Sequence, residues 1–287
     1  MSVGQQLVTL DANKEDSFIF KTSFPTSGNF HAIAELDSDE REGDNRFYFT
    51  LHIPDQRNIA IIANSKEESY YINESMKALN KAGEILIITE FNSIDAQNLV
   101  LKNQDVVFII SSGTTVNIND SKIEEYLYNG GHLIILPGLY FNTEDYSFLN
   151  SLTSDIYGNY NNLSFNELSV NSFQDIDISS IQIREIYNIF LSATSQDRNI
   201  RIFKYITLPY DPEFSQLLLN DGSSIWNRYD INNGIIDVLG IAINLNWSIF
   251  PIKGTFLPFI HFMTFSQKSS KENLSKTTGK RWEIIPK

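Results

Sequence analysis

A loop rich in hydroxyl groups, Ser111-Ser-Gly-Thr-Thr115, has residue types that could bind a ligand. It follows the apolar run Val106 to Ile110, which is typical of a strand buried on both faces. Open α/β sheets bind ligands at the carboxyl ends of their strands, so these hydroxyl and backbone N–H groups could hold an anion or a sugar. The loop has neither the lysine of a P-loop nor the glycine spacing of a dinucleotide site. An ordinary strand-to-helix loop is the simpler interpretation. The ligand-binding alternative would use residues from three loops: Ser65, Ser111, Ser112, Gly113, Thr114 and Tyr140.

Residues that could bind a metal are scattered along the chain. The four histidines are His31, His52, His132 and His261, and no two of them have the helical spacing of a zinc site. The acidic stretch Asp37 to Asp44 could suggest calcium. An EF-hand loop, however, needs glycine at its sixth position, where this chain has Glu42, and Gly43 comes one residue late. We expect packed or surface histidines, a solvated acidic turn, and neither a metal nor another cofactor.

Composition excludes several classes of function. The chain has 287 residues, a net charge of -13 and no cysteine. Nucleic acid and anionic membrane surfaces are disfavoured as partners because binding them needs clustered Lys and Arg. The lack of cysteine removes disulfides, thiolate metal sites and a cysteine nucleophile. No apolar run approaches the length of a membrane span, and the first ten residues lack the features of a signal peptide.

The central part of the chain alternates strands with helices. Strands are predicted at residues 58–63, 84–89, 106–110 and 133–136. Helices are predicted after Ser65, over 93–103 and after Asp120. Ser65 with Glu68, and Ser121 with Glu124, have the capping-box spacing that begins a helix. This order predicts a mainly parallel, doubly wound α/β sheet.

The two ends of the chain show other patterns. Before residue 54, alternating segments predict antiparallel strands at 7–10, 18–20, 30–36 and 46–53, which resemble the later part of an immunoglobulin-like domain. After Gly138 we expect a short helix over 146–152 and a polar surface excursion over 155–177. Strands are then predicted at 181–190, 200–207, 216–219, 224–231 and 235–243, the last three forming a meander. The predicted division is 1–55, an immunoglobulin-like β-segment; 56–268, an α/β domain; and 269–287, a linker and the start of a further segment.

Three segments of the chain resemble a known group of bacterial proteins. They are Asp105 to Ile110, Tyr126 to Gly138, and Trp247 to His261. They look like the soluble part of BatA-like, aerotolerance regulator-type membrane proteins, in which an immunoglobulin-like segment precedes a class I glutamine amidotransferase-like domain. The resemblance implies transmembrane helices outside these residues, a periplasmic, inner membrane-anchored location, and envelope proteins as partners.

The amidotransferase-like fold places a cysteine nucleophile on a sharp turn after a central strand. The matching turn here is Leu136-Pro-Gly-Leu-Tyr-Phe141, which contains no Cys, Ser or Thr. Tyr140 is a poor nucleophile because a phenol titrates near pH 10. We therefore predict no catalytic residue and a non-catalytic interaction or scaffold function. The alternatives are a hydrolase with noncanonical residues and a small-ligand or carbohydrate sensor.

A late segment, Gly254 to Gln267, predicts a helix with aromatic side chains around much of its surface. The simpler interpretation is a helix that covers the sheet. Alternatively, Phe262 and Phe265 lie on its outer face and contact a partner or a neighbouring domain.

We predict that metal does not stabilise the fold, since neither thiolates nor paired histidines are present. Thermal melting of the purified chain with and without a chelator should give the same midpoint. A fall of many degrees after chelation would show that a structural metal had been missed.

Overall fold

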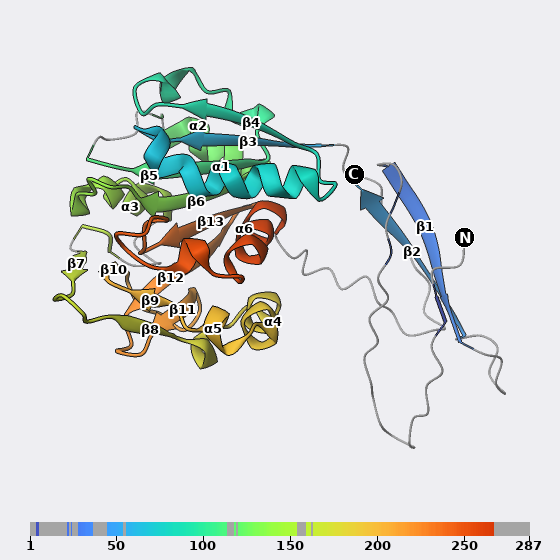
Figure 1. The fold of residues 1–287 in the computed structure, drawn as a ribbon. Helices are drawn as coiled ribbons and strands as arrows, with labels where there is room; N and C mark the ends of the chain where they lie inside the picture. Colours follow the sequence, from blue (N-terminus) through green and yellow to red (C-terminus); the bar gives the residue numbers. More distant parts are fainter. Residues whose placement is uncertain are drawn as a thin grey trace. The chain divides into compact units, whose positions relative to one another are not determined.

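The computed structural model describes residues 4–5, 22, 24, 28–36, 45–53, 56–113, 118, 120–153, 159–161 and 163–266 (Figure 1). The chain divides into two compact units, Met1–Asp55 with Asn273–Lys287, and Gln56–Glu272. No helix among the described residues has both the length and the apolar character needed to cross a bilayer.

In the first unit, the described residues form one antiparallel pair of strands. β1 (Gly28–Glu35) pairs antiparallel with β2 (Arg46–Ile53), in a register that places Phe30 opposite Leu51. The two strands confirm the predictions at 30–36 and 46–53. The predicted strands at 7–10 and 18–20 and the acidic turn at 37–44 lie outside the described residues.

The second unit is built on a large mixed sheet with the strand order β4-β3-β5-β6-β13-β12-β11-β8-β9 (Figure 1). The parallel strands are β3 (Arg57–Ile62), β4 (Leu86–Phe91), β5 (Val106–Ser111), β6 (His132–Pro137) and β13 (Gly234–Leu239). The antiparallel strands are β12 (Ser224–Ile231), β11 (Ser215–Leu219), β8 (Gln174–Asp177) and β9 (Arg201–Ile202). A separate pair joins β7 (Ser164–Glu167) to β10 (Lys204–Thr207). The sheet is thus divided between parallel and antiparallel pairings, whereas the sequence predicted a mainly parallel one.

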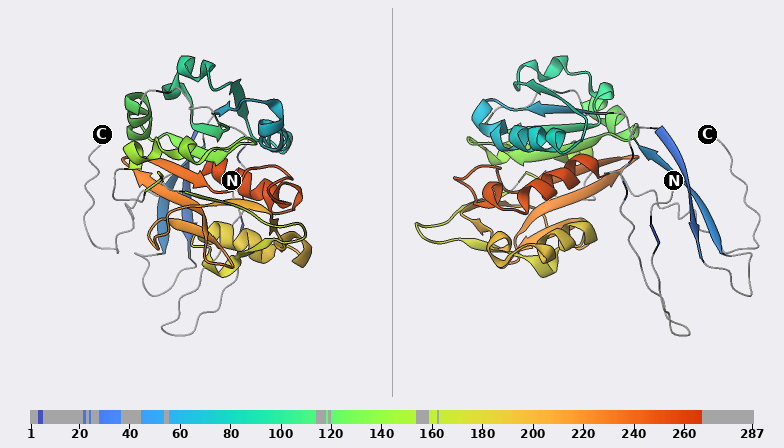
Figure 2. Two further views of the ribbon diagram at one scale, coloured as in Figure 1. Left: turned by 90° about the vertical axis from the view of Figure 1, so that its left-hand side faces the viewer. Right: turned by 45° about the vertical axis from the view of Figure 1, so that its right-hand side comes forward.

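Helices cover both faces of this sheet (Figure 2). α1 (Lys66–Lys81), α4 (Arg184–Ser192) and α6 (Phe256–Phe265) pack on one face, around residues such as Ile72, Phe190 and Phe259. α2 (Asp120–Tyr128) and α3 (Leu149–Thr153) pack on the other, where Leu127 and Leu149 belong to a second apolar cluster. β5 and β6 lie between the two clusters and every residue in them is buried, as their continuous apolar runs predicted.

Three predictions for individual elements were wrong. Residues 93–103 form two 3₁₀ turns, Asp95–Asn98 and Leu101–Asn103, in place of one helix. The stretch 155–177 was predicted as a polar surface excursion without strands, but it contains β7, which is largely exposed, and β8, whose Ile176 is buried against the large sheet. Residues 181–190 lead into helix α4 and do not form a strand. Ile186 and Phe190 are four residues apart and both buried, so the helical period prevailed over the β-propensity of isoleucine.

The remaining short elements connect these layers. They are four 3₁₀ or helical turns: Thr143–Tyr146, Ile178–Ser180, α5 (Ser195–Arg198) and Phe250–Ile252. The predicted meander is confirmed by the antiparallel pairing of β11, β12 and β13. Its second turn includes Asn232 with a φ of 54°, a left-handed conformation that asparagine tolerates better than most residues.

Ile110 tests the burial of the central strand. It is 1% exposed within an apolar cluster, so Ile110→Asp would bury an unpaired carboxylate. We expect the second unit to unfold, since the cost of several kcal/mol is comparable with a total stability of about 5–15 kcal/mol. Ile94→Asp is the matched control because Ile94 is 76% exposed. Urea denaturation followed by circular dichroism should separate the two variants, and equal midpoints would contradict the burial of β5.

Candidate functional site

The carboxyl ends of β3, β5 and β6 meet at one edge of the sheet. The chain leaves β3 through α1 to β4 on one side, whereas β5 continues to β6 on the other side. The ends of β3 and β5 therefore form a topological switch point, the usual ligand position in such sheets. The loops after these strands contain the predicted residues Ser65, Ser111, Ser112, Gly113 and Tyr140, while Thr114 lies outside the described residues.

Ser65 serves as the N-cap of α1. Its Oγ accepts a hydrogen bond from the backbone N–H of Glu68 at 3.4 Å, and its backbone is extended as an N-cap requires. A full capping box would return the Glu68 carboxylate to the N–H of Ser65. That carboxylate instead accepts hydrogen bonds from the N–H groups of Asn64, at 3.1 Å to Oε2, and Leu139, at 2.9 Å to Oε1. Glu68 thus links the start of α1 to the turn after β6.

The Glu68 side chain is the main feature of this site that sequence reasoning missed. The residue is only 4% exposed, although glutamate is rarely buried without a partner. Backbone N–H groups at a helix N-terminus and after a strand bind anions, and here the protein's own carboxylate occupies them. The Ser-x-x-Glu spacing was the only signal, and it predicts a capping box equally well.

Ser112 joins the same loops through two hydrogen bonds. Its Oγ accepts from the N–H of Tyr140 at 3.1 Å, and its carbonyl oxygen accepts from Nδ2 of Asn64 at 3.3 Å. The Asn64 Oδ1 accepts in turn from the N–H of Ser93 at 3.4 Å. The Tyr140 side chain is 80% exposed and turns away from this arrangement. The polar groups of the loops therefore largely satisfy one another.

Gly113 is held in a position that only glycine suits. Its φ is 67°, and a Cβ there would come within 2.9 Å of the Tyr140 carbonyl oxygen. Its N–H donates to Oδ2 of Asp145 at 2.7 Å, which ties the end of β5 to the first 3₁₀ turn after β6. Ser111 lies before it, 1% exposed, and its Oγ has no hydrogen-bond partner.

Gly138 occupies the sharp turn where the resemblance placed a nucleophile. A Cβ at this position would lie 2.6 Å from Oε1 of Glu68 and 2.6 Å from Cβ of Ser112. Both distances are far shorter than van der Waals contact, so the turn has no room for a side chain at residue 138 unless its neighbours move. Glu68 can approach the turn this closely because position 138 carries no side chain.

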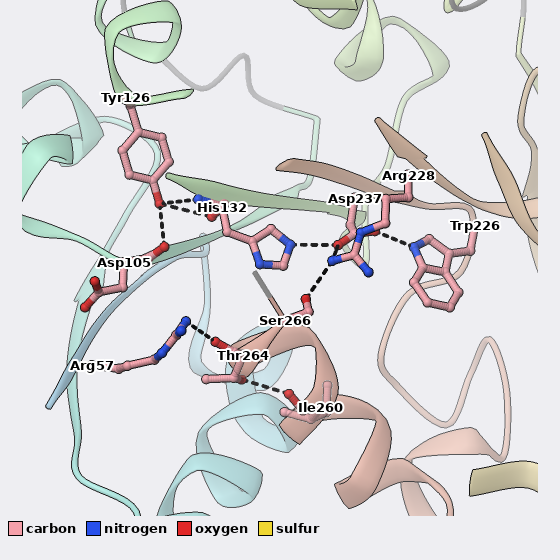
Figure 3. A network of polar contacts seen from close by, with 10 residues as sticks. All are labelled: Arg57, Asp105, Tyr126, His132, Trp226, Arg228, Asp237, Ile260, Thr264 and Ser266. Carbon is pink, nitrogen blue, oxygen red and sulfur yellow. Dashed lines mark hydrogen bonds and ion pairs between the residues drawn. The ribbon is translucent and has the colours of Figure 1, made fainter. Parts of the chain in front are cut away.

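A second polar cluster lies at the amino end of β6 and is centred on Asp237 of β13 (Figure 3). The Asp237 carboxylate is fully buried. Oδ2 contacts Nε2 of His132 at 2.7 Å and a guanidinium nitrogen of Arg228 at 3.3 Å, and Oδ1 accepts from Nε1 of Trp226 at 2.7 Å. Burial raises the pKa of the Asp237 carboxyl, but the charge of Arg228 and the hydrogen bonds from His132 and Trp226 outweigh burial and lower it overall. His132 was expected to be a packed or surface histidine, and it is a packed one.

Phe262 and Phe265 of α6 are partly buried against the first apolar cluster. The guanidinium of Arg228 lies 5.1 Å from the Phe262 ring centre, and that of Arg57 lies 5.2 Å from the Phe265 ring centre. Cation–π contacts of this kind cover aromatic surface that would otherwise be open. An interaction surface on these two side chains stays a prediction, reduced in area by the two arginines.

A polar hollow of about 490 Å³ lies elsewhere, beside the amino ends of β3 and β5. It is lined by Asn58, Thr89, Lys102, Asn103, Gln104 and Asp105. None of the predicted ligand residues contributes to it. In the described part of the chain, no group of three or more His, Asp or Glu side chains is placed to hold a metal ion.

Glu68→Ala should destabilise the second unit by about 1–3 kcal/mol, because it leaves the N–H groups of Asn64 and Leu139 without their acceptor. Glu67→Ala is the control, since Glu67 lies in the same helical turn and is exposed. That substitution should change stability by less than about 1 kcal/mol. Chemical denaturation measures both variants, and equal losses would mean that the Glu68 carboxylate does not hold the two loops together.

Comparison with known proteins finds structures of similar fold but no family that the chain matches. No family model and no curated protein sequence matches the chain. A cytoplasmic protein from Salmonella typhimurium is similar in structure, with a TM-score of 0.52, 13% identity, and coverage of 85% of this chain and 97% of that one. A ThuA-like protein from Bacteroides uniformis has a TM-score of 0.45 at 12% identity over 73% of this chain and 89% of that one. An exo-β-1,4-mannosidase from an Opitutaceae bacterium has a TM-score of 0.38 at 10% identity and is matched over 66% of this chain but only 32% of its own length. The first likeness indicates a common mixed α/β fold, and the two weaker ones add nothing to it.

Proposed function

We propose that this chain is a non-catalytic interaction or scaffold module of a membrane-anchored bacterial envelope protein. In this proposal the second unit is a class I glutamine amidotransferase-like domain and the β1–β2 hairpin belongs to an immunoglobulin-like segment. The partners are other envelope proteins, and the membrane is reached only through segments beyond these residues. The helices on both faces of β4-β3-β5-β6 support the domain assignment.

The observation that carries the proposal is the closed turn at Gly138. The position has no side chain, and a Cβ there would meet Glu68 and Ser112 at 2.6 Å. The adjacent N–H of Leu139 is the kind of donor that stabilises an oxyanion during acyl transfer, but it donates to the Glu68 carboxylate. A carboxylate beside that donor would compete with an oxyanion for the same N–H group. Position 138 therefore offers no nucleophile, and the N–H of Leu139 is not available to bind an oxyanion.

An interaction role is also supported by the edge strand β4. It is the last strand on its side of the sheet, so its outer backbone groups face away from β3. Ile85 before this strand, Ile87 within it, and Ile94 and Val100 after it are between 46% and 76% exposed. Exposed apolar side chains beside an open strand edge are typical of proteins that bind other proteins.

A ligand sensor is the second candidate, and three buried hydroxyls favour it. Ser69, Ser93 and Ser111 are each 1–2% exposed and have side-chain oxygens without a hydrogen-bond partner. They lie in elements that begin or end at the carboxyl edge of the sheet. Unpaired buried hydroxyls are costly, so a bound water or small ligand could satisfy them.

Activity assays test the first proposal. The purified chain, incubated with glutamine and with activated esters, should show no turnover above the buffer rate. Tyr140→Phe is an informative variant, because the exposed phenol is the one hydroxyl within the turn at 136–141 and its removal leaves the packing intact. Turnover that is lost on any single substitution within 136–141 would contradict the proposal. Thermal-shift measurements with a panel of sugars and carboxylic acids would detect the sensor instead.

A further inference from the structure

Two side chains that can carry positive charge share one carboxylate oxygen inside the second unit. Oδ2 of Asp237 contacts both Nε2 of His132, at 2.7 Å, and Arg228, at 3.3 Å. The His132 and Asp237 side chains are 4% and 0% exposed, and that of Arg228 is 12% exposed. A buried carboxylate of this kind cannot gain a further partner from water, so a stronger bond to one cation weakens the bond to the other.

The arginines of this cluster also hold the last turn of α6 (Figure 3). Arg228 donates to Oγ of Ser266 at 2.6 Å, and Arg57 donates to the carbonyl oxygen of Thr264 at 2.7 Å. The same guanidinium groups lie over Phe262 and Phe265. Cations suit this position because the carbonyl groups at a helix C-terminus carry partial negative charge. The end of α6 is therefore bound to the sheet through two positive charges as well as through its buried apolar side chains.

His132 has one place for an additional proton. Its Nε2 donates to the ionised Asp237, so Nδ1 is the unprotonated nitrogen of the neutral ring. Nδ1 is buried and has no hydrogen-bond partner. Protonation there would create a cation whose new N–H has no acceptor, beside the two arginines that hold α6.

The surrounding elements offer little negative charge to balance that cation. β3 contributes Arg57 and β12 contributes Arg228. Asp105, before β5, binds the N–H of Asn58 with its carboxylate. The Tyr126 hydroxyl of α2 bonds the main chain of Asp105 and His132, and burial raises the pKa of this phenol so that it stays neutral.

On α6 itself, His261 pairs with Glu84 at 3.3 Å, and both side chains are more than a third exposed to solvent. Among the described residues, the His132 ring therefore bonds to one carboxylate, Asp237, which already faces Arg228.

Burial lowers the pKa of His132, the bond to Asp237 opposes that effect, and the charges of Arg228 and Arg57 reinforce it, so the pKa lies below its usual value. An opened state that exposes the ring restores a pKa of about 6.5 and so binds the proton more tightly than the closed state. The closed state is thus fully stabilised above about pH 6.5 and loses stability as the pH falls below it.

We propose that the cluster around Asp237 is a pH-sensitive latch: it holds the C-terminal turn of α6 while His132 is neutral and releases that turn when His132 takes up a proton. Protonated His132 binds Oδ2 of Asp237 more strongly and repels Arg228 and Arg57. The contacts of these arginines with Ser266, Thr264 and the two phenylalanines are then lost. Release of this turn would uncover Phe262 and Phe265.

Hydrogen exchange of the full chain between pH 7.5 and 5, followed by mass spectrometry and corrected for the intrinsic pH dependence of exchange, tests the latch. In the wild type, the opening constant of Phe256–Phe265 should rise below about pH 6.5, by at most tenfold per pH unit for one proton. Peptides from β5 should show no such rise. His132→Gln should abolish the pH dependence in α6. His261→Gln, which changes the other histidine near this turn, should leave it unchanged.

Several outcomes would overturn the latch. They are an opening constant in α6 that does not vary with pH, an equal rise in β5, or a rise that survives in His132→Gln. If His132→Gln does not fold, ¹⁵N NMR of the wild-type ring decides the matter. Nδ1 should be unprotonated at pH 7.5 and should titrate below about pH 6.5, together with the amide signals of α6. Titration of the ring without a coincident change in α6 would also refute the proposal.

Discussion

The buried carboxylate of Asp237 is the interaction on which the second unit depends most. It lies on β13, the strand at which the parallel half of the sheet meets the antiparallel half. Its partners come from both sides, His132 on β6 and Trp226 with Arg228 on β12. A carboxylate in this position is tolerable only because each oxygen has a donor. The need for a donor at each oxygen holds β6 and β12 against β13. Through the bond of Arg228 to Ser266, it also holds the end of α6.

Glu68 is a second buried carboxylate, at the opposite edge of the sheet, and its oxygens have a different kind of donor. Its carboxylate is satisfied by two backbone N–H groups, and no cation bonds to it in the described part of the chain. The arrangement needs a close approach of α1 to the turn after β6, and Gly138 permits that approach. What stabilises the fold at this edge thus also fills the place in which open α/β sheets usually bind a substrate. The proposed non-catalytic role rests on this same contact.

The sequence predicted the elements whose signals are local. β5 and β6 were predicted because both faces are buried and their apolar runs are continuous, and the meander because Asn-Gly-type turns separate its strands. α4 was mistaken for a strand because its isoleucines suit either structure and its period shows only over a few residues. Of the candidate site, the loops at Ser65, Ser112 and Gly113 were predicted to come together. The carboxylate that closes them was not, because its partner Leu139 lies 71 residues away. Asp237 was also missed, because it is a single charged residue within the apolar strand Gly234–Leu239 and its partner His132 is far away in the sequence.

The two polar clusters lie at opposite edges of the sheet, so the buried His–Asp pair is not placed to supply a base to the turn at Gly138. A general base must lie within hydrogen-bond reach of the nucleophile that it activates, directly or through one water. His132 begins β6 and Pro137 ends it, so the strand itself separates the imidazole from the turn at Gly138. At about 3.3 Å per residue, that separation is roughly 16 Å or more. Nε2 of His132 bonds Asp237, and Nδ1 is buried without a hydrogen-bond partner (Figure 3). Among the described residues, Nδ1 of His132 therefore has no hydrogen-bond partner that it could activate. This separation supports the proposed binding module, and the proposed response to acidity rests on the same buried imidazole.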